Sequence, residues 1–250
     1  MERWNGRVAL VTGASMGIGE AICRSLVKCG LKVVGCARSF DKLQKLEDEL
    51  KDESGSFHPV KCDLRDEDEI LKMFRWIKDH FKGVDICVNN AGMALNSPLG
   101  SGDTEAWRCM LDLNVLALSI CSREAVQSMK SRGVNDGHIV NINSMSGHRV
   151  ISSPAFHFYS ATKYAVTGLT AGLRNELRLM NSRIRITSIS PGKVDTNFFS
   201  NVYPNKPKTE SKGMLELESK DISDAVIYIL SAPPHVEVND IHMRPVDQKH

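Results

Sequence analysis

The sequence has few of the features that mark a nucleic-acid-binding protein or a membrane protein. Its 250 residues include 32 Lys and Arg against 30 Asp and Glu, a net charge of +2, whereas nucleic-acid-binding proteins usually show a strong basic excess. The longest late apolar run, at residues 225–230, is far shorter than the ~18 residues that a membrane-spanning helix needs. We therefore predict no nucleic acid partner and no membrane span.

The seven cysteines form neither a disulfide pattern nor a zinc pattern. Their number is odd, their neighbours are mostly apolar, and no two are separated by just two residues, as a paired CxxC zinc site would require. We expect reduced, buried cysteines and no metal site. The N-terminus has no secretory apolar region and the C-terminus no retention or lipidation signal, so a soluble protein of the reducing cytoplasm is favoured.

Short apolar segments alternate with longer segments of helical periodicity. Strands are predicted at residues 7–12, 32–37, 57–61, 86–89, 137–143, 185–190 and 241–243, and helices at 19–29, 40–49, 66–81, 105–130, 155–180 and 223–230. This alternation predicts βαβ units with right-handed crossovers, and therefore an α/β fold with a parallel sheet. We expect one domain over residues 1–250, in which the non-periodic segment 197–220 is a substrate-binding loop.

Three glycines, Gly13, Gly17 and Gly19, occupy the turn between the first predicted strand and the first predicted helix. Their spacing is GxxxGxG, which differs from the GxGxxG dinucleotide fingerprint. Glycine allows a tight turn and lets a pyrophosphate approach the N-terminus of the helix, where free N–H groups and the helix dipole favour anions. The turn favours a dinucleotide site, with an ordinary tight turn as the alternative.

The tip of the second predicted strand carries Arg38 and has no carboxylate. Dinucleotide folds that bind NAD place an acidic residue here for the ribose 2′-hydroxyl, whereas NADP sites use arginine. The planar guanidinium of Arg38 can bind a 2′-phosphate through two hydrogen bonds. We therefore predict NADP(H) in preference to NAD(H); a solvated surface charge is the alternative interpretation of Arg38.

Five motifs occur in an order that resembles one family. They are TGASMGIG at 12–19, NNAG at 89–92, NSMSG at 143–147, YSATK at 159–163 and PGKVDT at 191–196. On these motifs the chain resembles the short-chain dehydrogenase/reductase family over roughly residues 7–196 plus the final helix and strand. The resemblance implies a single Rossmann-like domain with a seven-stranded parallel sheet, oxidoreductase activity, and a homodimer or homotetramer.

A narrower resemblance rests on LKVVGCAR, NINSMSGHRV, HFYSATKYAVT and DIHMRP. These segments resemble the "member eleven" group of dehydrogenase/reductases, which includes insect farnesol dehydrogenases and vertebrate keto-steroid reductases. This resemblance implies NADP(H)-dependent redox chemistry on an alcohol or a ketone.

Tyr159 and Lys163 are four residues apart, so they share one face of the predicted helix. A neighbouring ammonium favours the phenolate and lowers the pKa of a tyrosine, so Tyr159 can act as general acid in reduction and general base in oxidation. By resemblance, Lys163 also holds the nicotinamide ribose, and Asn114 distorts its helix and holds a water in a proton relay. A simple buried amide is the alternative for Asn114.

Two serines compete for the position that contacts the substrate oxygen. Ser144 lies three residues before Gly147, as the family's serine does, whereas Ser146 has the common family separation of 13 residues from Tyr159. The register set by the strand and the glycine favours Ser144, which would stabilise charge on the substrate oxygen. Ser146 stays open as the alternative.

The resemblance also implies a set of residues that line the cofactor. The set is Gly13, Ser15, Met16, Gly17, Ile18, Gly19, Arg38, Asp63, Leu64, Asn90, Ala91, Gly92, Tyr159, Lys163, Pro191, Gly192, Val194 and Thr196. Asp63 and Leu64 would contact the adenine. Asn90 has an equally good structural alternative, in which it joins neighbouring strands.

The expected substrate contacts are Ser144, Ser146, Tyr159 and Phe198. Other candidates for the pocket are mostly apolar: Met93, Leu95, Met145, Val150, His157, Phe199, Val202 and Tyr203. An apolar cleft with few polar groups suits a terpenoid alcohol, a steroid or a hydrophobic ketone. Retinoids, small dicarbonyls and other carbonyl compounds are alternative substrates, and a non-catalytic NADP(H)-binding sensor is the alternative from another class.

Overall fold

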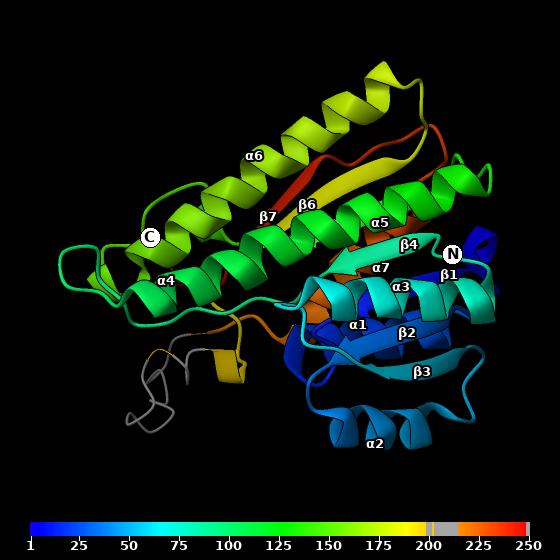
Figure 1. Ribbon diagram of the computed structural model, residues 1–250, viewed down its shortest axis with the longest axis horizontal. Coiled ribbons are helices and arrows are strands. Elements are labelled where there is room, and N and C mark those ends of the chain that lie inside the picture. The colour runs from blue at the N-terminus through cyan, green and yellow to red at the C-terminus, as the bar shows by residue number, and fades with distance from the viewer. Residues whose placement is uncertain (199–201, 203–214, 249–250) are drawn as a thin grey trace.

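The computed structural model describes residues 1–198, 202 and 215–248 and has a seven-stranded sheet at its centre (Figure 1). The strands are β1 (Val8–Thr12), β2 (Lys32–Ala37), β3 (Ser56–Lys61), β4 (Ile86–Asn89), β5 (His138–Ile142), β6 (Arg185–Pro191) and β7 (Asp240–Met243). Every neighbouring pair is parallel, and the strand order is β3-β2-β1-β4-β5-β6-β7. The predicted α/β fold with a seven-stranded parallel sheet is confirmed.

The helices connect these strands and agree with most of the predicted ranges. They are α1 (Gly17–Lys28), α2 (Phe40–Leu50), α3 (Glu67–Phe81), α4 (Thr104–Leu111), α5 (Leu118–Ser131), α6 (His157–Leu179) and α7 (Ser219–Ser231). Short helical turns lie at η1 (Glu2–Trp4), η2 (Asp112–Ala117), η3 (Met145–Gly147) and η4 (Pro154–Phe156). Within the described ranges, no helix has the length and apolar character that crossing a bilayer requires.

Three predicted boundaries were wrong. The helix predicted at 105–130 is divided, because the π-helical segment η2 separates α4 from α5. The helix predicted from residue 155 begins instead at His157, after the 3₁₀ turn η4 that starts at Pro154. Helix α7 begins at Ser219, inside the predicted loop, since Glu218 and Asp221 form a reciprocal capping box at its start.

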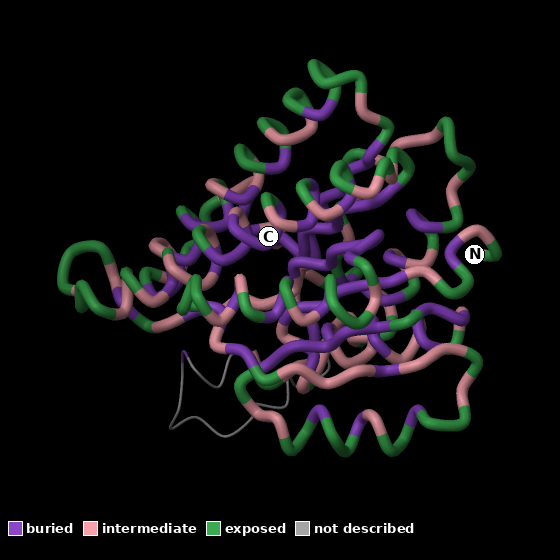
Figure 2. Tube along the Cα trace, turned by 45° about the vertical axis from the view of Figure 1, so that its right-hand side comes forward, coloured by how far each residue is buried: buried purple, intermediate pink, exposed green. Residues whose placement is uncertain are grey.

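The two faces of the sheet are covered by different sets of helices. Successive strand residues point to opposite faces: in β1, Ala9 and Val11 pack with α1, α2 and α7. Val8 and Leu10 pack on the other side with residues of α3, α5 and α6. The five inner strands are therefore buried along most of their length, whereas the edge strands β3 and β7 are not, and each helix keeps one exposed side (Figure 2). This double cover explains why the strands are continuous apolar runs.

The recognised motifs follow directly from the carboxyl ends of the strands. Thr12 ends β1, Asn89 ends β4, Ile142 ends β5 and Pro191 ends β6. Parallel strands end at one edge of a sheet, so the glycine turn, NNAG, NSMSG and PGKVDT are brought to the same edge. The strand order also changes direction between β1 and β4, where doubly wound folds bind their ligands. We call this edge the exit end.

The opposite edge, which we call the start end, is held together by buried charge. Asp85 precedes β4, is 5% exposed, and accepts a hydrogen bond of 2.9 Å from the backbone N–H of Val8. The same carboxylate pairs with Arg7 at 3.3 Å and with Arg132 at 3.0 Å. These bonds join the starts of β1 and β4 to the end of α5.

Candidate active site

The glycine turn after β1 has the backbone that its sequence predicts. Gly13 and Gly17 have φ values of +67° and +59°, in the left-handed region that favours glycine. A Cβ on Gly19 would lie 2.3 Å from the carbonyl oxygen of Gly13, so only glycine lets the start of α1 pack this closely on the turn. Helix α1 starts at this point without a side-chain cap on Met16, and its first N–H groups suit an anion such as a pyrophosphate.

Asn90 holds the glycine turn in place from the neighbouring strand. Its side-chain amide donates to the carbonyls of Thr12 at 2.8 Å and Gly13 at 3.2 Å. In return, the Thr12 hydroxyl accepts from the backbone N–H groups of Asn90 and Ala91, each at 3.0 Å. Of the two roles considered for Asn90, the geometry shows the structural one directly.

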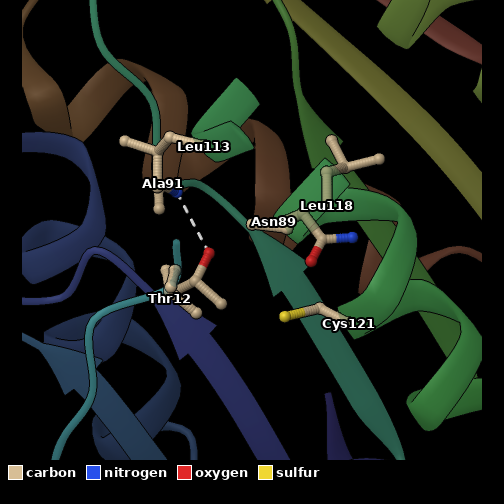
Figure 3. A pocket seen from close by; sticks show the side chains of 8 residues that line it. Thr12, Asn89, Ala91, Leu113, Leu118 and Cys121 are labelled. Carbon is tan, nitrogen blue, oxygen red and sulfur yellow. Dashed lines mark hydrogen bonds between the residues drawn. The ribbon is translucent and has the colours of Figure 1, made fainter. Parts of the chain in front are cut away.

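A small cavity lies next to these bonds, between the ends of β1 and β4 and helix α5 (Figure 3). Its volume is about 10 Å³, which is room for about one water. The lining residues are Thr12, Leu64, Asn89, Ala91, Leu113, Ala117, Leu118 and Cys121. Leu64 and Ala91, two residues of the predicted cofactor set, are therefore close together.

Arg38 and Asp63 follow β2 and β3, which are adjacent in the sheet. The guanidinium of Arg65 lies 2.8 Å from the Asp63 carboxylate, and this pairing lowers the pKa of Asp63. Arg38 is exposed and adds a smaller effect in the same direction, but no carboxylate among the described residues forms an ion pair with it. Its charge is thus available to a bound phosphate.

Tyr159 and Lys163 lie one turn apart on α6 and are both buried, at 6% and 5% exposed. The Lys163 Nζ donates a hydrogen bond of 2.9 Å to the carbonyl of Ile142 and lies 5.8 Å from the centre of the Tyr159 ring. A Cβ on Gly92 would lie 3.8 Å from this Nζ. The predicted pair therefore meets the NNAG segment at the exit end.

The pKa of Tyr159 is determined mainly by burial and not by the charge of Lys163. Burial raises the pKa of Tyr159, although the hydrogen bond with Ser144 acts in the opposite direction. Burial also lowers the pKa of Lys163 to about 8. The expected lowering of the tyrosine pKa is not found in this structure, where burial is the largest cause and Lys163 is not among the causes.

The two candidate serines occupy different positions. The side chain of Ser144 is half-buried and interacts with Tyr159, and its hydroxyl accepts from the backbone N–H of Ser146 at 3.1 Å. Ser146 itself is buried in η3, at 3% exposed. The strand register thus brings Ser144 against the tyrosine and turns the backbone of Ser146 towards Ser144.

Asn114 lies in η2, the π-helical segment, so the distortion implied by the resemblance is present. Its Oδ1 accepts from the N–H of Met93, while its Nδ2 donates to the Met93 carbonyl, both at 2.8 Å. The other Nδ2 hydrogen goes to the Thr162 hydroxyl at 3.0 Å. π-Helical segments are rare and frequently occur at functional sites; here the segment joins α6 to the chain after NNAG.

The PGKVDT segment closes the site from the β6 side. Gly192 donates from its N–H to the carbonyl of Met243 at 2.7 Å, and Val194 forms an isolated parallel bridge with Leu217. A Cβ on Gly17 would lie 3.3 Å from the Thr196 methyl group. Thr196 is therefore beside the glycine turn, which connects the two halves of the predicted cofactor set.

An apolar cluster surrounds Tyr159 and contains much of the predicted substrate site. Phe198 lies 5.5 Å from the tyrosine ring. The cluster consists of Met93, Ala94, Leu95, Trp107, Met110, Ile151, Ala155, Phe156, Phe158, Tyr159, Phe198 and Val202. Val150 is 60% exposed and does not belong to it. The candidates Phe199 and Tyr203 lie outside the described residues.

The sequence interpretation missed Trp107 and Phe158, whose rings are stacked at 5.2 Å. Trp107 belongs to α4, and its indole N–H donates to the carbonyl of Ser97 at 3.1 Å. The run of aromatic residues just before Tyr159 was a signal for Phe158. No such signal marked Trp107 in the sequence, because an apolar residue on an amphipathic helix is usually part of the core.

A glycine turn at the switch point of a doubly wound sheet, beside a serine, a tyrosine and a lysine, is an arrangement typical of dehydrogenases. The comparison with known families agrees: the short chain dehydrogenase model matches residues 7–207. The chain belongs to the short-chain dehydrogenase/reductase family and is an oxidoreductase of that family.

Its relatives are similar along nearly their whole length. Dehydrogenase/reductase SDR family member 11 of Gallus gallus is 57% identical over 99% of both chains. Farnesol dehydrogenase of Aedes aegypti is 46% identical over 100% of both. Among solved structures, the closed form of serine dehydrogenase complexed with NADP⁺ matches with a TM-score of 0.88 and 33% identity, covering 97% of this chain and 96% of that one.

Proposed function

We propose that the protein is an NADP(H)-dependent oxidoreductase that interconverts a hydrophobic alcohol and its ketone or aldehyde, such as a farnesol-like terpenoid alcohol or a keto-steroid. The observation that carries the proposal is the position of Tyr159. Its phenol interacts with Ser144, its ring centre lies 5.8 Å from the Nζ of Lys163, and its ring belongs to an apolar cluster.

Each polar group of the site has a role in this proposal. Tyr159 gives a proton to the substrate oxygen in reduction and takes it back in oxidation, and Ser144 donates a hydrogen bond to that oxygen. Lys163 holds the nicotinamide ribose, close to Gly92, and Asn114 supports Lys163 by a proton relay. The nicotinamide, when bound, supplies or accepts the hydride.

Three further groups of residues would hold the cofactor. The glycine turn, with Ser15, Met16 and Ile18, would bind the pyrophosphate, since the start of α1 has no side-chain cap and its free N–H groups favour an anion. Asp63, Leu64 and the backbone of 90–92 would bind the adenosine, and Pro191, Gly192, Val194 and Thr196 the nicotinamide. NADP⁺ is bound to the structurally similar serine dehydrogenase, which supports the same choice here.

Arg38 gives the test of cofactor preference. The substitution Arg38→Asp removes the guanidinium that would form charge-assisted hydrogen bonds with the 2′-phosphate. The Kd for NADPH should therefore rise by about 10- to 100-fold. NADH lacks that phosphate, so its affinity should change little. Fluorescence titration of both cofactors measures the ratio, and equal losses would contradict the assignment of Arg38. Arg75→Gln, at an exposed arginine on α3, is the control.

The substrate class is proposed from the cluster around Tyr159. Its members are apolar or aromatic, and the 46% identical relative of Aedes aegypti is a farnesol dehydrogenase. Retinoids and small dicarbonyls are the second choice, since they are also apolar or small enough for such a cluster. Turnover of farnesol, a keto-steroid, a diketone and retinal, each with NADP(H) and NAD(H), separates these classes by the absorbance of the reduced nicotinamide.

Tyr159→Phe is the decisive control for that panel. It removes only the phenolic oxygen, so turnover should fall by about 10²- to 10⁴-fold while NADPH still binds. Turnover by this variant close to that of the unmodified enzyme would contradict the catalytic role. Cofactor binding without turnover of any substrate by the unmodified protein would favour the non-catalytic sensor instead.

The proposal also covers assembly and location. The exposed apolar residues Leu116 on η2 and Leu169 on α6, at 53% and 38% exposed, suit a homodimer or homotetramer. All seven cysteines are free, which supports a cytoplasmic enzyme. We propose one domain over residues 1–250, with the substrate-binding loop near 197–220; much of that loop lies outside the described residues.

A further inference from the structure

A surface depression of about 700 Å³ lies at the start end of the sheet. It is formed by the end of α6, the start of β6, the segment before β7 and the N-terminal η1. Its lining residues are Arg3, Asp136, Arg174, Leu177, Arg178, Ser182, Arg183, Ile184, Arg185, Pro234, His235, Val236 and Glu237. In Figure 1 the ends of α6 and α5 and the N-terminus lie on this side, away from the start of α6 that carries Tyr159.

The depression carries more positive than negative charge. Five arginines and two carboxylates line it, an excess of three positive charges with the histidine neutral. One carboxylate, Asp136, binds Arg7 with both oxygens, at 2.7 and 2.9 Å. The other, Glu237, accepts from the N–H of Ile186 and from Arg178, each at 3.2 Å. Neither carboxylate pairs with the remaining four arginines among the described contacts.

Three of those four arginines are bonded to backbone carbonyls instead. Arg185 donates to Val236 at 3.0 Å, and Arg3 donates to Leu230 at 2.9 Å. Arg174 donates to the carbonyl of Asn239 at 2.9 Å and also lies 4.0 Å from the carboxylate of Asp240, outside the depression's lining. A carbonyl oxygen satisfies an N–H group but leaves the positive charge in place.

Arg185 has the strongest need for a negative partner. It is only 5% exposed, and its Nη2 is buried with no hydrogen-bond partner among the described residues. Arg174 Nε is in the same situation. Burial, together with the nearby Arg3, lowers the pKa of Arg185 to about 10. A buried charge without a partner is costly, so an anion close by would relieve a real energetic cost.

We propose that this depression is a binding site for a metabolite-sized polyanion that carries phosphate or carboxylate groups. Its volume is within the range of small-molecule sites, which is about 300–1,000 Å³, and guanidinium groups bind such oxyanions through paired hydrogen bonds. Arg183 is exposed and has no carboxylate partner in the described part of the chain, so it stands at the rim with Arg178. The more buried Arg185 and Arg174 add to the positive electrostatic potential inside the depression.

The test is calorimetric titration with pyrophosphate at constant ionic strength. The double variant Arg178→Gln with Arg183→Gln removes two exposed charges and leaves the buried arginines intact. Its Kd for pyrophosphate should rise by about tenfold or more. The unfolding temperature of the unmodified protein should also rise with pyrophosphate, and this rise should be smaller in the double variant.

Two controls separate this site from other binding. Arg75→Gln makes the same chemical change elsewhere on the surface and should leave the Kd unchanged. Arg38→Gln removes a charge from the proposed cofactor site, and a loss of pyrophosphate binding there instead would overturn the proposal. Citrate titrated in the same way separates carboxylate from phosphate ligands, and saturable binding of either supports the site.

Other results would also overturn the proposal. The absence of saturable binding by both probes would do so, as would equal affinity in the double variant. If a second copy of the chain covers the depression, the double variant will sediment as a smaller species than the unmodified protein, and a small-anion site is then excluded. None of these readouts depends on turnover, so they stand apart from the proposed oxidoreductase activity.

Discussion

The two ends of the same sheet use polar groups in opposite ways. At the exit end, neutral hydrogen bonds of Thr12, Asn90 and Asn114 connect segments of backbone, and one buried ammonium, that of Lys163, has no carboxylate partner among the described residues. At the start end, the buried carboxylate of Asp85 has two arginine partners. Around β1 and β4, the exit end therefore keeps an unpaired charge and the start end uses paired charge. On the β6 side of the start end, in the depression, Arg185 is a second buried charge without a carboxylate partner among the described residues.

The difference indicates where the fold gains and loses stability. A buried charge that has partners and hydrogen bonds can make a zero or favourable contribution to the free energy of folding. Its removal leaves the partner charges buried without a counter-charge, which destabilises the fold. A buried charge without a counter-charge is a cost that only a function explains. By this reasoning Lys163 marks the proposed active site at the exit end, Arg185 marks the proposed anion site in the depression, and Asp85 is structural.

The largest effect is expected from the serine that touches Tyr159. Ser144→Ala removes a donor to the charge that develops on the substrate oxygen, and it should lower kcat by about 10²- to 10³-fold. Ser146→Ala is the matched control, since the same atom is removed two residues away and the Ser146 backbone N–H is kept. Steady-state kinetics on both variants gives the comparison.

The same pair of variants decides which serine acts at the exit end. A larger loss in Ser146→Ala would assign the role to Ser146, whose separation from Tyr159 is the commoner one in the family. The unfolding temperature of each variant should be measured too, because Ser146 is buried and its loss can act through packing.

The sequence was sufficient to predict the exit end, since its determinants are local. Gly13 and Gly17 need positive φ, and only glycine accepts that conformation readily. Each motif follows a short apolar run, and parallel strands necessarily end together. The choice between the two serines was also made from local register, with Gly147 as the reference.

Features that depend on distant partners could not be predicted. Nothing near Asp85 in the sequence shows that Arg7 and Arg132 will reach it, from 78 and 47 residues away. The stacking of Trp107 on Phe158 joins α4 to α6, and the depression brings Arg3 next to the four arginines of residues 174–185. The net charge of +2 also gives no sign of the local excess of arginine in the depression, because a net charge does not show where on the surface the charges lie.

The start end should respond to Asp85→Asn with a loss of stability. The variant keeps the shape and loses the charge that Arg7 and Arg132 face, so the free energy of unfolding should fall by about 3 kcal/mol. Asp136→Asn is the control, because Asp136 pairs with the same Arg7 at a more exposed position, with a side chain that is 55% exposed. It should cost less than about 1 kcal/mol.

Urea-induced unfolding measures both values, and turnover below the transition should be unchanged in both variants. Equal costs for Asp85→Asn and Asp136→Asn would contradict the assignment of a special structural role to the buried carboxylate. A change in turnover without a change in stability would contradict the division between the two ends.

Lys163→Met should change stability less than Asp85→Asn does, and in the opposite direction. Burial lowers the pKa of Lys163 from 10.5 to about 8, so below pH 8 both the folded and the unfolded chain carry the proton and the cost of burying the charge is complete. Between pH 8 and 10.5 only the unfolded chain keeps the proton, and stability therefore rises with pH. Removing the ammonium should stabilise the cofactor-free protein at pH 7 by on the order of 2 kcal/mol, after allowance for the lost bond to Ile142.

This gain should shrink as the pH approaches 10.5, because the lysine of the unmodified protein then becomes neutral in the folded state. Lys72→Met, at an exposed position on α3, should show no such pH dependence. Unfolding temperatures of the three proteins across this pH range test the prediction. A variant at Lys163 that is less stable than the unmodified protein at pH 7 would mean that the ammonium is well solvated or paired, and the exit end would then have no unpaired buried charge to explain.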